Sequence, residues 1–287
     1  MQNIKIMLYN TMKVAICGPV RNCGRYLTGV LNNMLILGKL FDEFVIIISY
    51  DHSMDNSLQI LHRFKNKHPN IIVYENTEPL LPYRTHRIAK ARNECLNIIN
   101  TTYPTYEYMI MMDCDDVNCK QMNLDVVKKH LRNPAWDSLS FMTAPVYYDI
   151  WGLSIYPYTY SYNHFNNSVQ QYSVIQQYVT NLLRARKNEL VRCISAFNGF
   201  ALYRMSKFKN CKYDGGVNLR LLPPHMLNAH MKASRSPLVM KIYPKAPGVN
   251  GYHEDCEHRA FHVQAITKNN AAICISSDIV FTRPLAR

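Results

Sequence analysis

The sequence lacks several features that define other classes of protein. Its 287 residues hold no run of five or six Lys and Arg, so we expect no dedicated nucleic-acid-binding tail, although the formal net charge is +13. None of the 9 Cys residues forms a Cys-x-x-Cys pair, which argues against a zinc site, and the odd count leaves at least one thiol unpaired within the chain. We therefore expect mostly reduced thiols in a reducing compartment.

Long apolar segments are missing as well. The longest strongly apolar run covers residues 45–48, whereas a membrane-spanning helix needs about 20 apolar residues. The first 13 residues contain only short apolar pieces and do not resemble a signal peptide. We expect a soluble, cytoplasmic chain without a transmembrane anchor. Peripheral contact with an anionic membrane stays open because the chain is basic.

The sequence also lacks the glycine-rich loops of several nucleotide-handling enzymes. Residues 18–22 follow the first apolar run without the glycine density that a sugar-nucleotide pyrophosphorylase needs there. Neither a P-loop nor the nucleophile elbow of a serine hydrolase occurs. A pyrophosphorylase is therefore disfavoured, and we keep it only as an alternative.

What the sequence does contain is a regular alternation of strands and helices. Short apolar runs predict buried strands at residues 14–17, 44–49, 71–74 and 108–112. Helical spacing or composition predicts helices at residues 24–40, 55–67 and 87–99. This alternation predicts an α/β fold with a parallel sheet and right-handed crossovers. The second half is less regular, with strand character at 136–148, 193–204 and 271–281 and a helix at 168–187.

Polar residues follow the ends of these strands. Asp113, Asp115 and Asp116 come directly after the fourth strand, and Arg21 and residues 51–55 follow the first two. In open parallel sheets, ligands bind beyond the carboxyl ends of the strands. Three neighbouring carboxylates repel one another unless a cation compensates, and oxygen ligands suit Mg²⁺ or Mn²⁺. We therefore predict a metal site here that neutralises a phosphate, with a solvated acidic turn as the alternative.

Three of these segments resemble motifs of family 2 glycosyltransferases, which have the GT-A fold. Residues 50–57 are similar to the family's Asp-Asp-Gly-Ser-Thr-Asp-Asn-Ser signature, residues 91–93 to its Ala-Arg-Asn, and residues 112–116 to its DxD motif. The order and spacing agree over roughly residues 13–120. This chain departs from the pattern at Tyr50, where the family often has Asp, and at His52 and Met54, where the family has small residues.

The resemblance implies one GT-A-like domain over residues 1–287, with a mixed, mainly parallel sheet flanked by helices. Residues 13–120 would bind the nucleotide sugar and metal, and residues 121–287 the acceptor. The donor would be a UDP- or GDP-linked sugar, used with Mn²⁺ or Mg²⁺. Its contacts would come from Pro19, Arg21, Asp51, Arg84, Arg87, Arg92, Asp113 and Cys114. Arginines suit this role because guanidinium binds phosphate through two parallel hydrogen bonds.

A second polar cluster lies at residues 253–262. Its Asp-Cys-Glu-His at residues 255–258 also resembles the Glu-Cys-Glu-His of fungal capsule-associated mannosyltransferases. An inverting enzyme needs a carboxylate to deprotonate the acceptor hydroxyl, and Glu257 is our first choice, with Asp255 and Glu254 as alternatives. A retaining enzyme needs no such base, and the cluster would then bind sugar or metal. The resemblance further implies that His262 joins Asp113 and Asp115 as a metal ligand.

Two other segments have readings that stay open. Gly199, inside an apolar strand, either lets the backbone approach a ligand closely or marks a bulge. The aromatic segment 147–162, which includes Trp151, either stacks on an acceptor sugar or packs in the core.

Taken together, these residues predict a metal-dependent hexosyl- or pentosyltransferase that acts on a glycan or a glycosylated carrier. No nucleic-acid partner is expected, because carboxylates without a metal repel phosphate. A non-catalytic basic protein that binds sugar or nucleic acid is the other alternative, since a fold and a site do not prove turnover.

Overall fold

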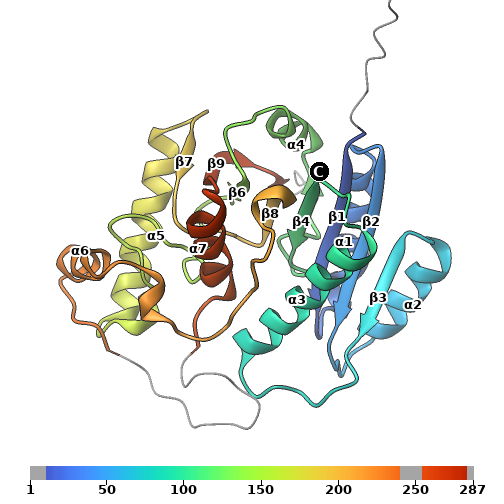
Figure 1. Ribbon diagram of the computed structural model, residues 1–287, viewed down its shortest axis with the longest axis horizontal. Helices are drawn as coiled ribbons and strands as arrows, with labels where there is room; N and C mark the ends of the chain where they lie inside the picture. Colours follow the sequence, from blue (N-terminus) through green and yellow to red (C-terminus); the bar gives the residue numbers. More distant parts are fainter. Residues whose placement is uncertain (1–10, 240–253, 283–287) are drawn as a thin grey trace, which may run out of the picture.

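The computed structural model describes residues 11–239 and 254–282. Its main sheet has eight strands in the order β3-β2-β1-β4-β8-β6-β9-β7 (Figure 1). The bounds of these strands are β1 Lys13–Val20, β2 Glu43–Tyr50, β3 Ile71–Glu75, β4 Tyr108–Met112, β6 Ser138–Met142, β7 Leu190–Arg192, β8 Phe200–Arg204 and β9 Ile273–Ile279. A separate pair joins β5 Gln121–Met122 to β10 Phe281–Thr282.

The main sheet has a parallel part and a mixed part. Strands β3, β2, β1 and β4 are parallel neighbours. Strand β8 runs antiparallel between β4 and β6, and β9 pairs parallel with β6 and antiparallel with β7. The predicted α/β class, with a mixed and mainly parallel sheet flanked by helices, is confirmed.

Helices cover both faces of the sheet. The α-helices of the described residues are α1 Gly24–Gly38, α2 Ser57–Lys67, α3 Arg84–Thr102, α4 Leu124–Leu131, α5 Ser168–Ala185, α6 Pro224–Ser234 and α7 Glu257–Asn269. In β1, Val14 and Ile16 join the core formed with α1, α2 and α4, whereas Ala15 and Cys17 join the core formed with α3 and α7. Successive strand residues point to opposite faces, so a sheet covered on both sides needs continuous apolar strands.

The parallel half agrees closely with the sequence-based expectations, and the second half less so. Strand β4 has the expected bounds, and α1, α2 and α5 lie within two residues of theirs. Helices α4, α6 and α7 were not predicted. Residues 1–10 and His253, which belong to segments considered above, lie outside the described residues.

Two further observations concern the whole described chain. Within residues 11–239 and 254–282, no helix combines the length and the apolar character needed to cross a membrane. The Cys side chains all occur as free thiols.

Candidate active site

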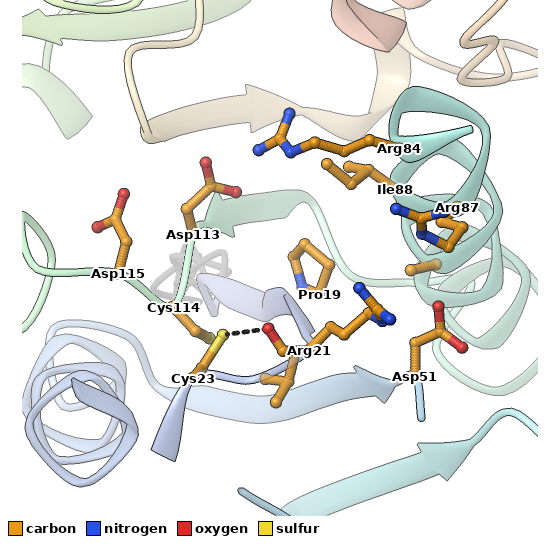
Figure 2. A pocket seen from close by; sticks show the side chains of 12 residues that line it. Pro19, Arg21, Cys23, Asp51, Arg84, Arg87, Ile88, Asp113, Cys114 and Asp115 are labelled. Atoms are coloured by element: carbon orange, nitrogen blue, oxygen red, sulfur yellow. Dashed lines mark hydrogen bonds between the residues drawn. The ribbon is translucent and has the colours of Figure 1, made fainter. Parts of the chain in front are cut away.

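A cavity of about 260 Å³ opens at the carboxyl ends of β1, β2 and β4. It is lined by Pro19, Val20, Arg21, Cys23, Asp51, Arg84, Arg87, Ile88, Ala91, Asp113, Cys114 and Asp115 (Figure 2). Parallel pairing brings the strand ends together, because Val20 at the end of β1 lies beside Tyr50 at the end of β2. The first turns of α3 add Arg84 and Arg87 above these ends. The cavity therefore combines residues from all the predicted donor-binding segments.

Asp51 lies at one end of the cavity. Its Oδ1 atom accepts a hydrogen bond from Nδ2 of Asn76 at 2.9 Å and another from the backbone N–H of His52 at 3.1 Å. The backbone N–H of Asp51 donates to the carbonyl of Val20 at 2.9 Å, which ties the β1 and β2 ends together. Asp55, in contrast, holds the start of α2 through the N–H and hydroxyl of Ser57. Asp51 therefore lines the cavity, whereas Asp55 is engaged at the start of the helix.

Three arginines form the basic part of the cavity. Nη1 of Arg87 donates to the carbonyls of Leu81 at 2.7 Å and Pro82 at 2.9 Å, which orients its guanidinium group. Burial, and next the charge of Arg21, lowers the pKa of Arg87. Among the described residues, no carboxylate forms an ion pair with Arg21, Arg84 or Arg87. Converging guanidinium groups without an acidic partner favour an anion such as a diphosphate.

The acidic cluster faces these arginines. Oδ1 of Asp115 accepts backbone N–H groups from Val117 at 3.0 Å and Asn118 at 3.2 Å, which leaves its other oxygen available. Burial, followed by the charge of Asp113, raises the pKa of Asp115 to about 6. Burial also raises the pKa of Asp113, against the opposing charge of Arg92. Ionising both carboxylates at once is therefore costly. A divalent cation bound to them would stabilise their ionised forms.

The described residues contain no ready-made group of three or more acidic, His or Cys ligands. A divalent cation still fits at Asp113 and Asp115, because Mg²⁺ in proteins commonly uses one or two carboxylates, with phosphates and waters completing its coordination shell.

Arg92 does not line the cavity but lies behind it. Its Nη2 atom donates to Oδ1 of Asp113 at 2.9 Å, and its Nε atom is 3.0 Å from Oε1 of Glu257. Its Cζ atom is 4.4 Å from the centre of the Phe197 ring. Burial opposes its charge, but Asp113 and Glu257 outweigh this effect and raise the pKa of Arg92. The expected donor contact of Arg92 is therefore replaced by a bridge between two carboxylates.

Glu257 begins α7 and is 4% exposed. Burial raises the pKa of its carboxyl group, although Arg92 acts in the opposite direction. Through Arg92, the acidic cluster after β4 and the late cluster at α7 form one network, although more than a hundred residues separate them in sequence. The two clusters that the sequence suggested separately thus belong to one site.

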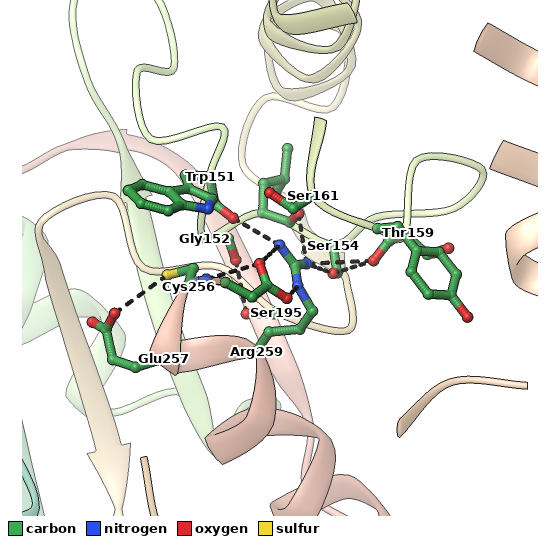
Figure 3. Close-up of polar contacts among 12 residues, drawn as sticks. Trp151, Gly152, Ser154, Thr159, Ser161, Ser195, Cys256, Glu257 and Arg259 are labelled. Atoms are coloured by element: carbon green, nitrogen blue, oxygen red, sulfur yellow. Dashed lines mark hydrogen bonds and ion pairs between the residues drawn. The ribbon is translucent and has the colours of Figure 1, made fainter. Parts of the chain in front are cut away.

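Asp255 and Arg259 form a buried clamp beside this network. Oδ2 of Asp255 accepts from Nε of Arg259 at 2.9 Å. The guanidinium group also donates to the carbonyls of Trp151 at 2.7 Å and Leu153 at 3.0 Å, and it contacts Ser154 (Figure 3). Asp255 is thus engaged with Arg259, much as Glu257 is with Arg92. The alternative Glu254 is similarly engaged, with the N–H and hydroxyl of Thr85.

The structure corrects the expectation for His262. This side chain is fully buried, its Nδ1 atom lies 2.9 Å from Oγ of Ser195, and its Nε2 atom lies 3.3 Å from the hydroxyl of Tyr203. Burial, followed by the charges of Arg259 and Arg92, lowers its pKa to about 3. Because both ring nitrogens are engaged in the core, His262 is not directed at Asp113 and Asp115 as a metal ligand.

Residues 15–211 match the model of glycosyl transferase family 2. The chain belongs to this family. The match covers more than half of the chain and reaches beyond the segment whose motifs carried the resemblance, which is therefore confirmed.

Individual glycosyltransferases are similar to the chain at low sequence identity. A poly(ribitol-phosphate) beta-glucosyltransferase of Bacillus spizizenii is 29% identical over 105 residues, which is 37% of this chain and 15% of that protein. A structure of S. aureus TarS with UDP-GlcNAc has 16% identity and a TM-score of 0.47, and the match covers 96% of this chain and 59% of that one. For the mannosyltransferase PcManGT of Pyrobaculum calidifontis with GDP-Man and Mn²⁺, the identity is 16%, the TM-score 0.44 and the coverage 88% and 69%.

The structure also shows site residues that the sequence did not single out. Cys23 and Ile88 line the cavity, and the carboxylate of Asp149 is close enough to raise the pKa of Asp113. Tyr148 adjoins the same acidic cluster. The aromatic segment 147–162 did attract attention in the sequence, but no local signal distinguishes Tyr148 from its many neighbouring tyrosines. Asn198, two residues before β8, holds the backbone N–H groups of Tyr148 and Asp149 through its Oδ1 atom.

Proposed function

We propose that this protein is a glycosyltransferase that moves a hexose or pentose from a UDP- or GDP-linked donor to a glycan or a glycosylated carrier. The observation that carries the proposal is the cavity itself, in which three arginines, not ion-paired with any carboxylate of the described residues, face two carboxylates beside Asp51. A nucleoside diphosphate bound together with a divalent cation would match this combination of charges. Membership of glycosyl transferase family 2 supports the reaction type.

The donor would lie along the edge of the sheet. Asp51, with Pro19 and Arg21, would bind the nucleoside, and Asp51 is already oriented by Asn76. Arg84 and Arg87 would bind the diphosphate through their guanidinium groups. Cys114 lines the floor between the acidic residues.

Asp113 and Asp115 would hold a Mn²⁺ or Mg²⁺ ion together with the diphosphate. When bound, such an ion neutralises charge that develops on the leaving phosphate. Arg92 favours the ionised form of Asp113 and holds this carboxylate in position through its 2.9 Å hydrogen bond. The basic cavity and the acidic ligands therefore act on the same group of the donor from two sides.

Glu257 would deprotonate the acceptor hydroxyl if the reaction inverts the anomeric centre. Burial raises the pKa of Glu257, and a carboxylate with a raised pKa is a better base near neutral pH. Asp255 would act through Arg259, by positioning the segment that carries Trp151. We place donor binding in residues 13–120 and acceptor binding in residues 121–287 of a single domain, in a soluble protein without a nucleic-acid partner.

A thermal shift screen tests this proposal. UDP, GDP and their common sugars would each be added with Mn²⁺ or with EDTA to the wild type, D115A and D116A. A ligand at about a hundred times its dissociation constant adds about 2.7 kcal/mol of stability. We expect one nucleotide class to stabilise the wild type only with metal, D115A to lose this shift, and D116A, altered at an exposed neighbouring position, to keep it. No shift of the wild type with any nucleotide would show that the proposal is wrong.

A further inference from the structure

Tyr148 is held in place from two sides. Its backbone N–H donates to Oδ1 of Asn198 at 3.3 Å, and its carbonyl accepts from the hydroxyl of Tyr172 at 3.1 Å. Asn198 also fixes the next residue, because the N–H of Asp149 donates to the same Oδ1 atom at 3.0 Å. The backbone that carries the Tyr148 side chain therefore has a defined position.

Gly199 makes room for the hydroxyl of Tyr148. A Cβ atom at this position would lie 2.6 Å from that hydroxyl oxygen, so no other residue fits without displacing it. Gly199 also has a φ of 82°, which disfavours side chains in any case. Its carbonyl accepts the backbone N–H of Asp113 at 2.9 Å, so the hydroxyl lies beside the backbone that carries the acidic cluster.

The hydroxyl has no hydrogen-bond partner among the described residues. Burial, followed by the carboxylates of Asp113, Asp115 and Asp149, raises the pKa of Tyr148. The phenol is therefore a neutral O–H donor next to the site. The residue is only partly buried and its hydroxyl is not sealed from solvent, so this donor is available to a ligand that enters the site.

The strand order gives the direction in which a donor would extend. Along the sheet, β2 with Asp51 is followed by β1 with Arg21, β4 with Asp113, and then β8, which begins beside Gly199. In a nucleoside-diphosphate sugar, the sugar follows the second phosphate. A donor whose nucleoside lies at Asp51 and whose diphosphate lies at Asp113 thus places its sugar toward Gly199 and Tyr148.

We propose that the hydroxyl of Tyr148 donates a hydrogen bond to the transferred sugar of the donor, in a space that Gly199 keeps open. The inference rests on the proposed function, because it requires a nucleotide-sugar donor. It adds a sugar-contacting residue on the far side of the acidic cluster from the nucleoside.

The test compares the affinities of the nucleoside diphosphate and its sugar conjugate by isothermal titration calorimetry. In Y148F we expect the diphosphate to bind within about twofold of the wild type and the sugar conjugate to bind about three- to tenfold more weakly, which is the effect of one hydrogen bond. Y178F is the matched control, because Tyr178 lies on α5, outside the site, and its phenol hydroxyl donates to the carbonyl of Tyr156. It should leave both affinities unchanged.

A second variant distinguishes a clash between a side chain at position 199 and the Tyr148 hydroxyl from a general disturbance of the site. G199A should weaken binding of the sugar conjugate more in the wild-type background than in the Y148F background, because without the hydroxyl the nearest ring atom is Cζ, at 3.6 Å from the added methyl group. Equal effects of G199A in the two backgrounds, or equal losses of diphosphate and sugar conjugate in Y148F, would contradict the inference.

The two proposals fail in different ways. If the wild type binds no nucleotide at all, the proposed function is wrong and this inference falls with it. If the wild type binds the sugar conjugate and Y148F binds it equally tightly, this inference alone is wrong.

Discussion

Arg92 shows at the scale of one residue how the site is held together. Its guanidinium group is buried between Asp113 and Glu257, at 2.9 and 3.0 Å. The sequence motif at residues 91–93 indicated a donor contact, and only the three-dimensional structure shows that Arg92 neutralises two carboxylates from distant segments. Local sequence cannot show which distant acids meet a given arginine.

Replacing Arg92 should therefore destabilise the fold as well as the site. R92A leaves the buried Glu257 and the partly exposed Asp113 without this counter-charge, and we expect the free energy of unfolding to fall by about 3–5 kcal/mol. Adding E257Q should recover part of this loss, because one of the two unpaired acids is then neutral. Urea unfolding of both variants measures this, with R63A, at an exposed position of α2, as the control. A loss in R92A no larger than in R63A would contradict the bridge.

At the scale of elements, the sequence predicted the parallel half well because apolar runs such as 44–49 are read locally. Helix α7 escaped prediction for a physical reason. Its residues Glu257, His258, Arg259 and His262 are buried, so the helix has no exposed polar face to set against an apolar one. The partners of these residues lie far away in sequence. Arg92, for example, pairs with both Glu257 and Asp113. The polar stretch indicated candidate bases and a metal ligand, whereas from Glu257 onward it is a helix packed in the core.

The clamp at Arg259 connects this helix to the aromatic segment. R259M should loosen residues 151–159, because their carbonyls lose the guanidinium donors. We expect faster hydrogen exchange of backbone amides in this segment, with α2 unchanged, as measured by mass spectrometry. The conservative R259K, which keeps the charge, should give a smaller increase. Equal exchange in wild type and R259M across residues 151–159 would show that the clamp does not hold them.

At the scale of the whole molecule, the fold buries several neutral histidines. Burial lowers the pKa of His230 and of His262 to about 3, and that of His258 well below its ordinary value of 6.5. His230 is a clear case, because its Nδ1 atom accepts the N–H of Tyr160 and its Nε2 atom lies 3.1 Å from Oε1 of Gln171. The folded protein thus holds these rings without their second proton.

This pattern predicts sensitivity to acid. Below about pH 6.5 the unfolded chain takes up protons that the folded chain does not, so stability is fully present above that pH and is lost as the pH falls. Each histidine contributes about 1.4 kcal/mol per pH unit. Urea unfolding between pH 8 and pH 5 should show this loss, and H230Q, which keeps donor and acceptor but does not titrate, should reduce its slope. A slope for H230Q equal to that of the wild type would contradict it.

The central claim is that Asp113 and Asp115 hold a divalent cation with the diphosphate of a nucleotide sugar. Anomalous diffraction from a crystal soaked with Mn²⁺ and the nucleotide tests it most directly. We expect one manganese peak beside the carboxylate of Asp115, in contact with the diphosphate, whose other oxygens reach Arg84 and Arg87. A nucleotide bound in the cavity with no manganese peak at these carboxylates, or a peak only elsewhere, would contradict the account.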